Sequence, residues 1–171
     1  MNNAISRYML SSEEARRASG VAWTILRPCA FMSKALRWIP QLRAGEVIGV
    51  PFGDVAAAAI DPYDIARVAA VALTSDGRDG QAYRLCGAES LLPAAQVRVL
   101  GGNLRLRPQP DEQARAEMSA SMPAEYVDAF MSFFADGTLD ESEVLPTVEE
   151  VTGRPPRTFE QWARLHADAL R

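Results

Sequence analysis

Apolar residues recur every three to four positions in several segments, which predicts that helices make up much of the fold. The clearest helix starts after Asp61, a predicted N-cap residue, with Pro62 in the first turn and Ile65, Val68 and Leu73 on one face. The same spacing predicts helices over residues ~4–19, 31–42, 92–100, ~111–120, ~123–135, ~141–152 and ~158–170.

Short runs of β-branched and aromatic residues between these helices predict strands over residues 21–26, 47–50, 56–60 and 81–86, and an extended piece over 104–107. Pro28 is expected to end the first strand. Strands alternate with helices up to Cys86, and mostly helices follow. The order predicts an α/β fold: an incomplete, Rossmann-like parallel sheet in residues 1–87, packed in one compact unit against a helical, substrate-binding lobe in residues 88–171.

Composition changes this picture little. Apolar residues make up 48% of the chain and charged residues 23%, which is typical of a globular protein. The net charge of −4 argues against a nucleic-acid partner, which favours a basic surface. There is no apolar run of membrane-spanning length and no apolar core in the first residues, so we expect a cytoplasmic protein without a membrane partner.

Few residues suggest metal or thiol chemistry. Cys29 and Cys86 lie far apart in sequence, and we expect two buried thiols in a reducing compartment rather than a disulfide. His166 is the single histidine, which excludes a two-histidine metal site.

A series of short motifs, in order and spacing, resembles the NmrA-like NAD(P)H-binding proteins of the atypical short-chain dehydrogenase/reductase group, which include azoreductase-like and quinone-reductase-like enzymes. Nearly the whole chain takes part. The motifs are Ala18-Ser19-Gly20, Trp23-Thr24-Ile25-Leu26-Arg27-Pro28, Phe31-Met32-Ser33, Pro51-Phe52-Gly53-Asp54, Ile60-Asp61-Pro62-Tyr63-Asp64-Ile65-Ala66, Tyr83-Arg84-Leu85-Cys86-Gly87 and Thr152-Gly153-Arg154-Pro155-Pro156-Arg157-Thr158-Phe159.

The resemblance implies a Rossmann fold that binds NADP or NAD, with the pyrophosphate on a glycine-rich turn of the first half. No Gly-x-Gly-x-x-Gly motif follows a strand here, so we expect this chain to supply the active-site loop and the substrate lobe, and to bind dinucleotide weakly by itself. The loop after residues 21–26 implies a cofactor or substrate pocket; the residues predicted for it are Arg27, Pro28, Cys29, Phe31, Met32 and Trp38. No catalytic residue is assigned.

Structural roles compete with functional ones at several positions. Pro28 and Phe31 can be assigned in two ways. Either both line this pocket, or Pro28 ends a strand and Phe31 fills the core. Tyr8 is followed four residues later by Ser12 instead of the lysine of the wider dehydrogenase class, which favours a structural tyrosine. Helix capping accounts for Asp61 and Asp64.

Two further groups are assigned structural places. The aromatic cluster of Phe130, Phe133 and Phe134 has the spacing of helix packing rather than of a binding surface. Arg154 and Arg157 are expected on an exposed turn, because prolines flank them.

Three functions remain open at this stage. The first is an NAD(P)H-dependent oxidoreductase of the quinone- or azo-reductase kind, with a small-molecule substrate. The second is a non-catalytic dinucleotide-sensing regulator, and the third is a truncated protein without independent activity. An uncovered edge of the strand over residues 21–26 predicts a homo-oligomer or an aggregation-prone chain. The alternative is that the N-terminal helix covers this edge and the chain stays monomeric.

Overall fold

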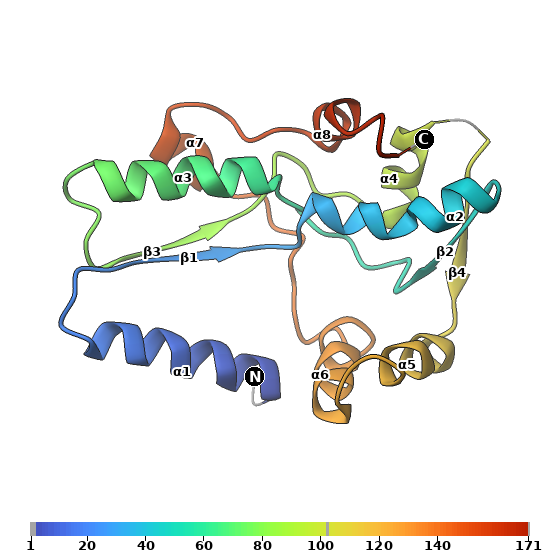
Figure 1. The fold of residues 1–171 in the computed structure, drawn as a ribbon, viewed down its shortest axis with the longest axis horizontal. Helices are drawn as coiled ribbons and strands as arrows, with labels where there is room; N and C mark the ends of the chain where they lie inside the picture. The colour runs from blue at the N-terminus through green and yellow to red at the C-terminus, as the bar shows by residue number, and fades with distance from the viewer. Residues whose placement is uncertain (1–2, 102, 171) are drawn as a thin grey trace.

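Two pairs of parallel strands organise the computed structural model, which describes residues 3–101 and 103–170 (Figure 1). Strand β1 (Thr24–Pro28) pairs with β3 (Gln81–Leu85), and β2 (Val47–Pro51) pairs with β4 (Arg105–Gln109). Each pair is joined by long crossover segments, as parallel strands require. The predicted α/β fold with parallel strands is therefore confirmed.

Helices surround these strands. In Figure 1, α3 and α7 lie on one side of the β1–β3 pair, α1 lies on the other, and α5 and α6 gather near β4. The helical elements are α1 (Ala4–Ala18), the 3₁₀ helix η1 (Met32–Trp38), α2 (Ile39–Ala44), α3 (Pro62–Thr74), α4 (Pro93–Leu100), α5 (Asp111–Ser119), α6 (Ala124–Phe134), α7 (Thr147–Thr152) and α8 (Phe159–Leu165).

Local sequence signals explain the helices that were predicted well. The side chain of Asp61 accepts a hydrogen bond from the Tyr63 backbone N–H at 2.9 Å and caps α3. Helix α8 begins with a reciprocal capping box between Thr158 and Gln161. It ends at Leu165, so its predicted extension to residue 170 is wrong.

Other boundaries differ from prediction because distant residues decide them. β1 starts at Thr24 and not at residue 21. The Trp23 backbone N–H donates a hydrogen bond to the Asp79 side chain at 2.7 Å, and not to a carbonyl group of a neighbouring strand. In place of the single helix predicted over residues 31–42, Phe31 is extended and precedes the 3₁₀ helix η1, which is followed by the short α2. In the predicted helix over 141–152, only Thr147–Thr152 is helical.

The strand predicted over residues 56–60 is also wrong. Its members form single bridges to three separate segments: Ala57 to Leu91 and Glu141, and Ile60 to Phe31. No neighbour runs beside this segment long enough to form a ladder. Residues 57–60 are nevertheless buried or half-buried, and they join the β1–β3 region to the rest of the chain.

The apolar core has two main parts. One lies between η1, β2, α4 and α8 and includes Trp38, Ile48, Phe159 and Trp162. The other lies between β3, α3 and α7. In the described part of the chain, no helix is long and apolar enough to cross a bilayer.

The expectation of two free thiols is wrong for this structure, in which Cys29 and Cys86 form a disulfide. The parallel register explains the pairing. Pro28 lies opposite Leu85, so the next residue of each strand is brought beside the other, with the Cα atoms 5.3 Å apart.

We therefore expect no free thiol in the unfolded, non-reduced protein and two after reduction, because both cysteines are committed to one bond. Thiol titration in denaturant, with and without prior reductant, measures this directly. Two titratable thiols before reduction would restore the interpretation from sequence.

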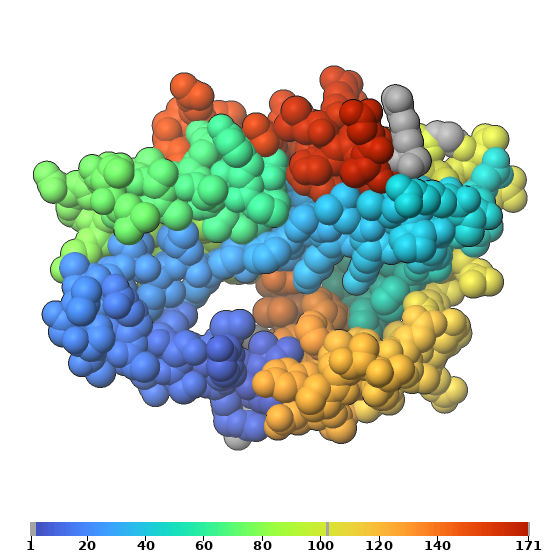
Figure 2. All heavy atoms as spheres, in the orientation of Figure 1, coloured from blue at the N-terminus to red at the C-terminus, as the bar shows by residue number. Residues whose placement is uncertain are grey.

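Helix α1 packs loosely. None of its residues is buried, and Tyr8, Met9 and Leu10 are all more than half exposed. Figure 2 shows an opening between this helix and the segment that follows β1. A polar contact joins α1 to β1: the Arg27 guanidinium donates to the Glu13 carboxylate, with N···O distances of 2.8 and 2.6 Å. Within the described residues β1 pairs with β3 alone, and homo-oligomer formation through its other edge stays a prediction.

Candidate functional site

A cavity of about 380 Å³ opens beyond the carboxyl end of β1. We call it the ring-lined cavity, because five aromatic side chains border it: Phe31, Trp38, Phe52, Phe130 and Phe134. These residues come from η1 and the residue before it, the turn after β2, and α6. Ligands of open α/β folds bind beyond the carboxyl ends of strands, which is where this cavity lies.

Main-chain hydrogen bonds fix the mouth of the ring-lined cavity. The Ile60 N–H donates to the Ala30 carbonyl at 2.7 Å, and the Met32 N–H donates to the Ile60 carbonyl at 2.9 Å. These two bonds hold Phe31 between them. The Ala58 N–H donates to the Glu141 carbonyl at 2.7 Å and brings a carboxylate residue to the same cavity.

The aromatic wall is held by contacts between rings. Phe52 and Phe134 have centroids 5.4 Å apart, and Phe130 and Phe134 are 6.2 Å apart. Phe52 has a φ of 55°, a conformation that non-glycine residues rarely adopt. Strained residues of this kind gather at binding sites, where surrounding structure imposes them. The turn therefore places a ring in the cavity at a conformational cost.

Three charged side chains border the ring-lined cavity: Lys34, Arg37 and Glu141. Burial raises the pKa of the Glu141 carboxyl, and the positive charges of Lys34 and Arg84 and a hydrogen bond from the Ala30 N–H partly oppose this rise. The Arg37 guanidinium has its pKa lowered by burial. A carboxyl that keeps its proton to higher pH is suited to donate it to a reacting group.

Replacing Glu141 with Gln should stabilise the protein at neutral pH, and the gain should disappear in acid. The raised pKa means that the folded state releases this proton later than the unfolded chain, so the wild type loses stability as pH rises through the folded pKa. Below the unfolded value, both states hold the proton and the difference vanishes.

Thermal unfolding of the wild type and of Glu141→Gln between pH 4 and pH 8 measures this difference in stability. The exposed Glu143, replaced in the same way, controls for the loss of a carboxylate near Arg84. A difference in midpoint that stays constant with pH would contradict the prediction.

The structure places some of the six residues predicted for a pocket at the ring-lined cavity and the others elsewhere. Phe31 and Trp38 border the ring-lined cavity. Arg27 pairs with Glu13, Cys29 is buried in the disulfide, and Met32 is in the core at 2% exposure. Pro28 is half-buried at the end of β1 and does not border the cavity. Contact of any of the six with a ligand stays a prediction.

Several residues of the cavity were not predicted as site residues. Phe130 and Phe134 were assigned to packing, yet both border the cavity as well as packing on each other. The sequence did contain a signal that could have pointed to Phe52 as a site residue, because its turn is one of the motifs shared with the NmrA-like proteins. Glu141 had none, because a single glutamate in an acidic stretch resembles a solvated residue.

A second polar cluster, outside the cavity, is structural. Asp64 is fully buried and accepts hydrogen bonds from Arg67 at 2.9 Å and from the Arg157 N–H at 2.8 Å. The Arg157 guanidinium binds Asp61 at 3.0 Å and lies over the Tyr63 ring. The exposed turn predicted for Arg157 is therefore wrong: its charge anchors the segment before α8 to the start of α3.

Comparison with known proteins gives the ancestry of this arrangement. The chain is 40% identical over 171 residues to a (4-alkanoyl-5-oxo-2,5-dihydrofuran-3-yl)methyl phosphate reductase of Streptomyces griseus, covering 97% of the chain and 61% of that protein. It is 35% identical to an NAD(P)H azoreductase of Xenophilus azovorans, covering 97% of the chain and 60% of the relative. No family model matches.

Solved structures give the same fold. An NADPH-dependent quinone oxidoreductase of Escherichia coli superposes with a TM-score of 0.74 at 21% identity, covering 95% of the chain and 62% of that structure. A triphenylmethane reductase of Citrobacter, solved with NADP(H), gives 0.70 at 16% identity, covering 91% and 57%.

The fold and the relatives define a partial Rossmann-type protein of NAD(P)H-dependent oxidoreductase ancestry. The chain belongs to the NmrA-like branch of the atypical short-chain dehydrogenase/reductase family. It spans about 60% of the length of the two curated relatives.

Proposed function

We propose that this chain is the acceptor-binding part of an NAD(P)H-dependent reductase, and that the ring-lined cavity receives a flat, conjugated acceptor such as a quinone or an azo compound. The observation that carries the proposal is the position of this cavity, directly beyond β1, with aromatic walls and one carboxyl group, that of Glu141, whose pKa is raised by burial. The azoreductase and the quinone oxidoreductase to which the chain is similar support this class of acceptor.

The residues present do not fit the pyrophosphate of a dinucleotide. Single glycines, Gly53 and Gly87, follow β2 and β3, and no glycine-rich turn leads directly from a strand into a helix in the described part of the chain. Such turns present the backbone N–H groups that bind pyrophosphate. We therefore expect weak NADPH binding by this chain alone.

The side chains of the cavity have separate tasks in this proposal. The hydride of such a reaction would come from a nicotinamide dinucleotide, whose pyrophosphate the described residues of this chain do not fit. Phe52, Phe130 and Phe134 bind the flat acceptor by ring contact and exclude water. Glu141, whose pKa is raised by burial, is the carboxyl group placed to donate a proton to an acceptor oxygen or nitrogen that gains negative charge.

Calorimetric titration of the chain with menadione, a naphthoquinone, tests the proposal. We expect saturable binding that is weakened about tenfold in Phe134→Ala, because the variant loses ring contact and buried apolar area. Tyr8→Ala is a matched control, since Tyr8 is an aromatic residue 62% exposed on α1 and away from the cavity. Absence of binding, or equal weakening by both variants, would contradict the assignment.

A further inference from the structure

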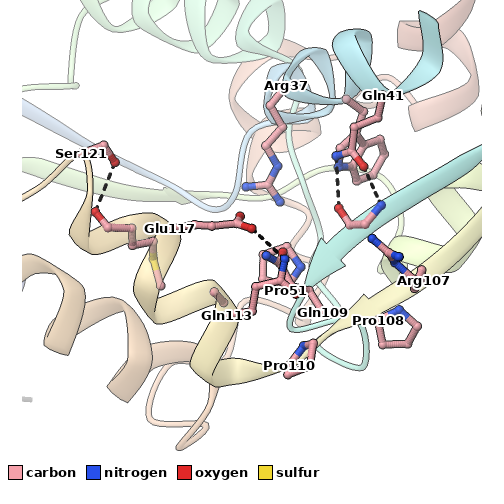
Figure 3. Close-up of a pocket in the computed structure, with 14 residues that line it drawn as sticks. Arg37, Gln41, Pro51, Arg107, Pro108, Gln109, Pro110, Gln113, Glu117 and Ser121 are labelled. Atoms are coloured by element: carbon pink, nitrogen blue, oxygen red, sulfur yellow. Dashed lines mark hydrogen bonds between the residues drawn. The ribbon is translucent and has the colours of Figure 1, made fainter. Parts of the chain in front are cut away.

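Beside the ring-lined cavity lies a second, more polar cavity of about 600 Å³, shown in Figure 3. We call it the polar cavity. Four residues border both spaces: Arg37, Trp38, Pro51 and Met118. The two cavities are thus neighbours across a wall that carries one permanent positive charge. A ligand in the ring-lined cavity has this guanidinium within its own boundary.

Arg37 has no counter-ion in the described part of the chain. None of the ion pairs formed there, defined by N···O distances up to 4.0 Å, includes this residue. The residue is exposed to solvent, although surrounding atoms desolvate its guanidinium enough to lower the pKa, and its side chain extends from η1 into the space above Glu117 (Figure 3). An arginine stays charged under all ordinary conditions, so it remains available to an anion that enters.

The other polar groups of the polar cavity are already engaged with one another. The amide of Gln41 donates to the Gly49 carbonyl at 3.3 Å and accepts from the Gly49 N–H at 2.7 Å. Glu117 accepts a hydrogen bond from Gln113 at 2.9 Å, and hydrogen bonds from Gln109 and Gln113 lower the pKa of its carboxyl. Among the described lining residues, the groups that remain without a partner are hydrogen-bond donors: the guanidinium groups of Arg37 and Arg107 and the buried indole N–H of Trp38.

Lys34 adds positive charge on the other side of the shared wall. It stands three residues before Arg37 in η1, and side chains at this spacing eclipse each other in a 3₁₀ helix. Glu141 lies close enough for the charge of Lys34 to oppose the rise in its pKa, so Lys34 has a nearby carboxyl group that balances its charge when ionised. Arg37 forms no ion pair within 4.0 Å among the described residues, although the Glu117 carboxylate lines the same polar cavity below it (Figure 3).

We propose that the ligand of this site is an amphipathic anion, whose flat apolar body lies in the ring-lined cavity and whose phosphate, sulfonate or carboxylate group binds Arg37 at the wall shared with the polar cavity. The inference rests on the proposed function in taking this ligand to be the acceptor. Arg107 adds long-range attraction from the far side of the polar cavity. A guanidinium matches the planar, two-oxygen face of such anions and forms charge-assisted hydrogen bonds with them.

A matched pair of probes separates the two parts of the proposal. Calorimetry compares 1-naphthyl phosphate with 1-naphthol, which shares the ring system and lacks the charge. The wild type should bind the phosphate ester about ten- to a hundred-fold more tightly, the range expected for a hydrogen bond to a charged group. Arg37→Gln should remove this preference by weakening the binding of the phosphate ester, with a much smaller change in the affinity for 1-naphthol.

Arg105→Gln is the control variant. It removes an exposed arginine from β4, two positions from Arg107, at a place that borders neither cavity. This variant should keep the full preference for the phosphate ester. An equal loss in Arg105→Gln would show that general surface charge attracts the ester, and would overturn the assignment to Arg37.

The remaining outcomes distinguish this inference from the proposed function. If the two probes bind equally well and Arg37→Gln changes neither, the anion site is overturned while the aromatic acceptor site stands. If neither probe binds, the ring-lined cavity is not a ligand site and both proposals fail. Tight binding of the ester that persists in Arg37→Gln would place its anionic group elsewhere and also overturn the inference.

Discussion

Replacing Asp64 with Ala should lower the free energy of unfolding by about 3–5 kcal/mol. The carboxylate is fully buried. Its loss leaves the Arg157 N–H without its acceptor and the Arg67 guanidinium without its ion-pair partner, although Arg67 keeps its hydrogen bond to the Thr152 hydroxyl. An uncompensated buried charge costs more than the ion pair contributes while intact. Urea unfolding followed by circular dichroism measures the change, with the same slope expected in both proteins.

Asp128→Ala is the matched control for this experiment. Asp128 also pairs with an arginine, Arg115 at 2.6 Å, but its side chain is 66% exposed. Exposed pairs contribute about 0–1 kcal/mol. We inferred above that the cluster around Asp64 anchors the segment before α8. A similar loss of unfolding free energy in the two variants would contradict that inference.

Gly87→Ala should prevent the native fold or destabilise it by more than about 4 kcal/mol. A Cβ atom at this position would lie 2.8 Å from the Ala59 carbonyl carbon and closer still to its oxygen. Both are backbone atoms of the segment over residues 57–60, which cannot move away without breaking its bridges to three other segments. Soluble yield and thermal unfolding of the purified variant report the effect.

Gly53→Ala serves as the comparison. A Cβ there would meet the Leu106 side chain at 3.5 Å, an ordinary van der Waals distance. We expect a change within about 1 kcal/mol for this variant. If Gly87→Ala unfolds at the same temperature as Gly53→Ala, the close approach of residues 59 and 87 is not required for folding.

Local signals account for what could be predicted from sequence. Asp61 and Pro62 locate the start of α3 by themselves, because capping acts within a few residues. Residues 57–60 were misjudged because their partners are residues 31, 91 and 141, which no local pattern identifies. Arg157 was misplaced for the same reason: its acceptor, Asp61, lies 96 positions earlier.

In the candidate site, too, local sequence signals identified some residues, and distant contacts decided the others. Phe31 and Trp38 were identified because they follow a recognisable strand, whereas Phe130 and Phe134 have the spacing of any packed helix. Whether an aromatic ring on α6 borders a cavity depends on how α6 sits against the turn at Phe52. That arrangement follows from tertiary packing, and the spacing along one helix contains no information about it.

The loose packing of α1 implies that the chain opens in parts rather than all at once. A helix of 15 residues that buries none of them is only marginally stable by itself in water. Its amide hydrogens should therefore exchange with solvent through local opening, far faster than those of β1 and β3. The pKa of Glu13 is lowered mainly by its hydrogen bond with Arg27, so the link is present above the ordinary glutamate value and is lost as pH falls through the lowered one. In a hydrogen-exchange experiment at decreasing pH, corrected for intrinsic exchange rates, α1 should lose protection first and the strands should keep theirs.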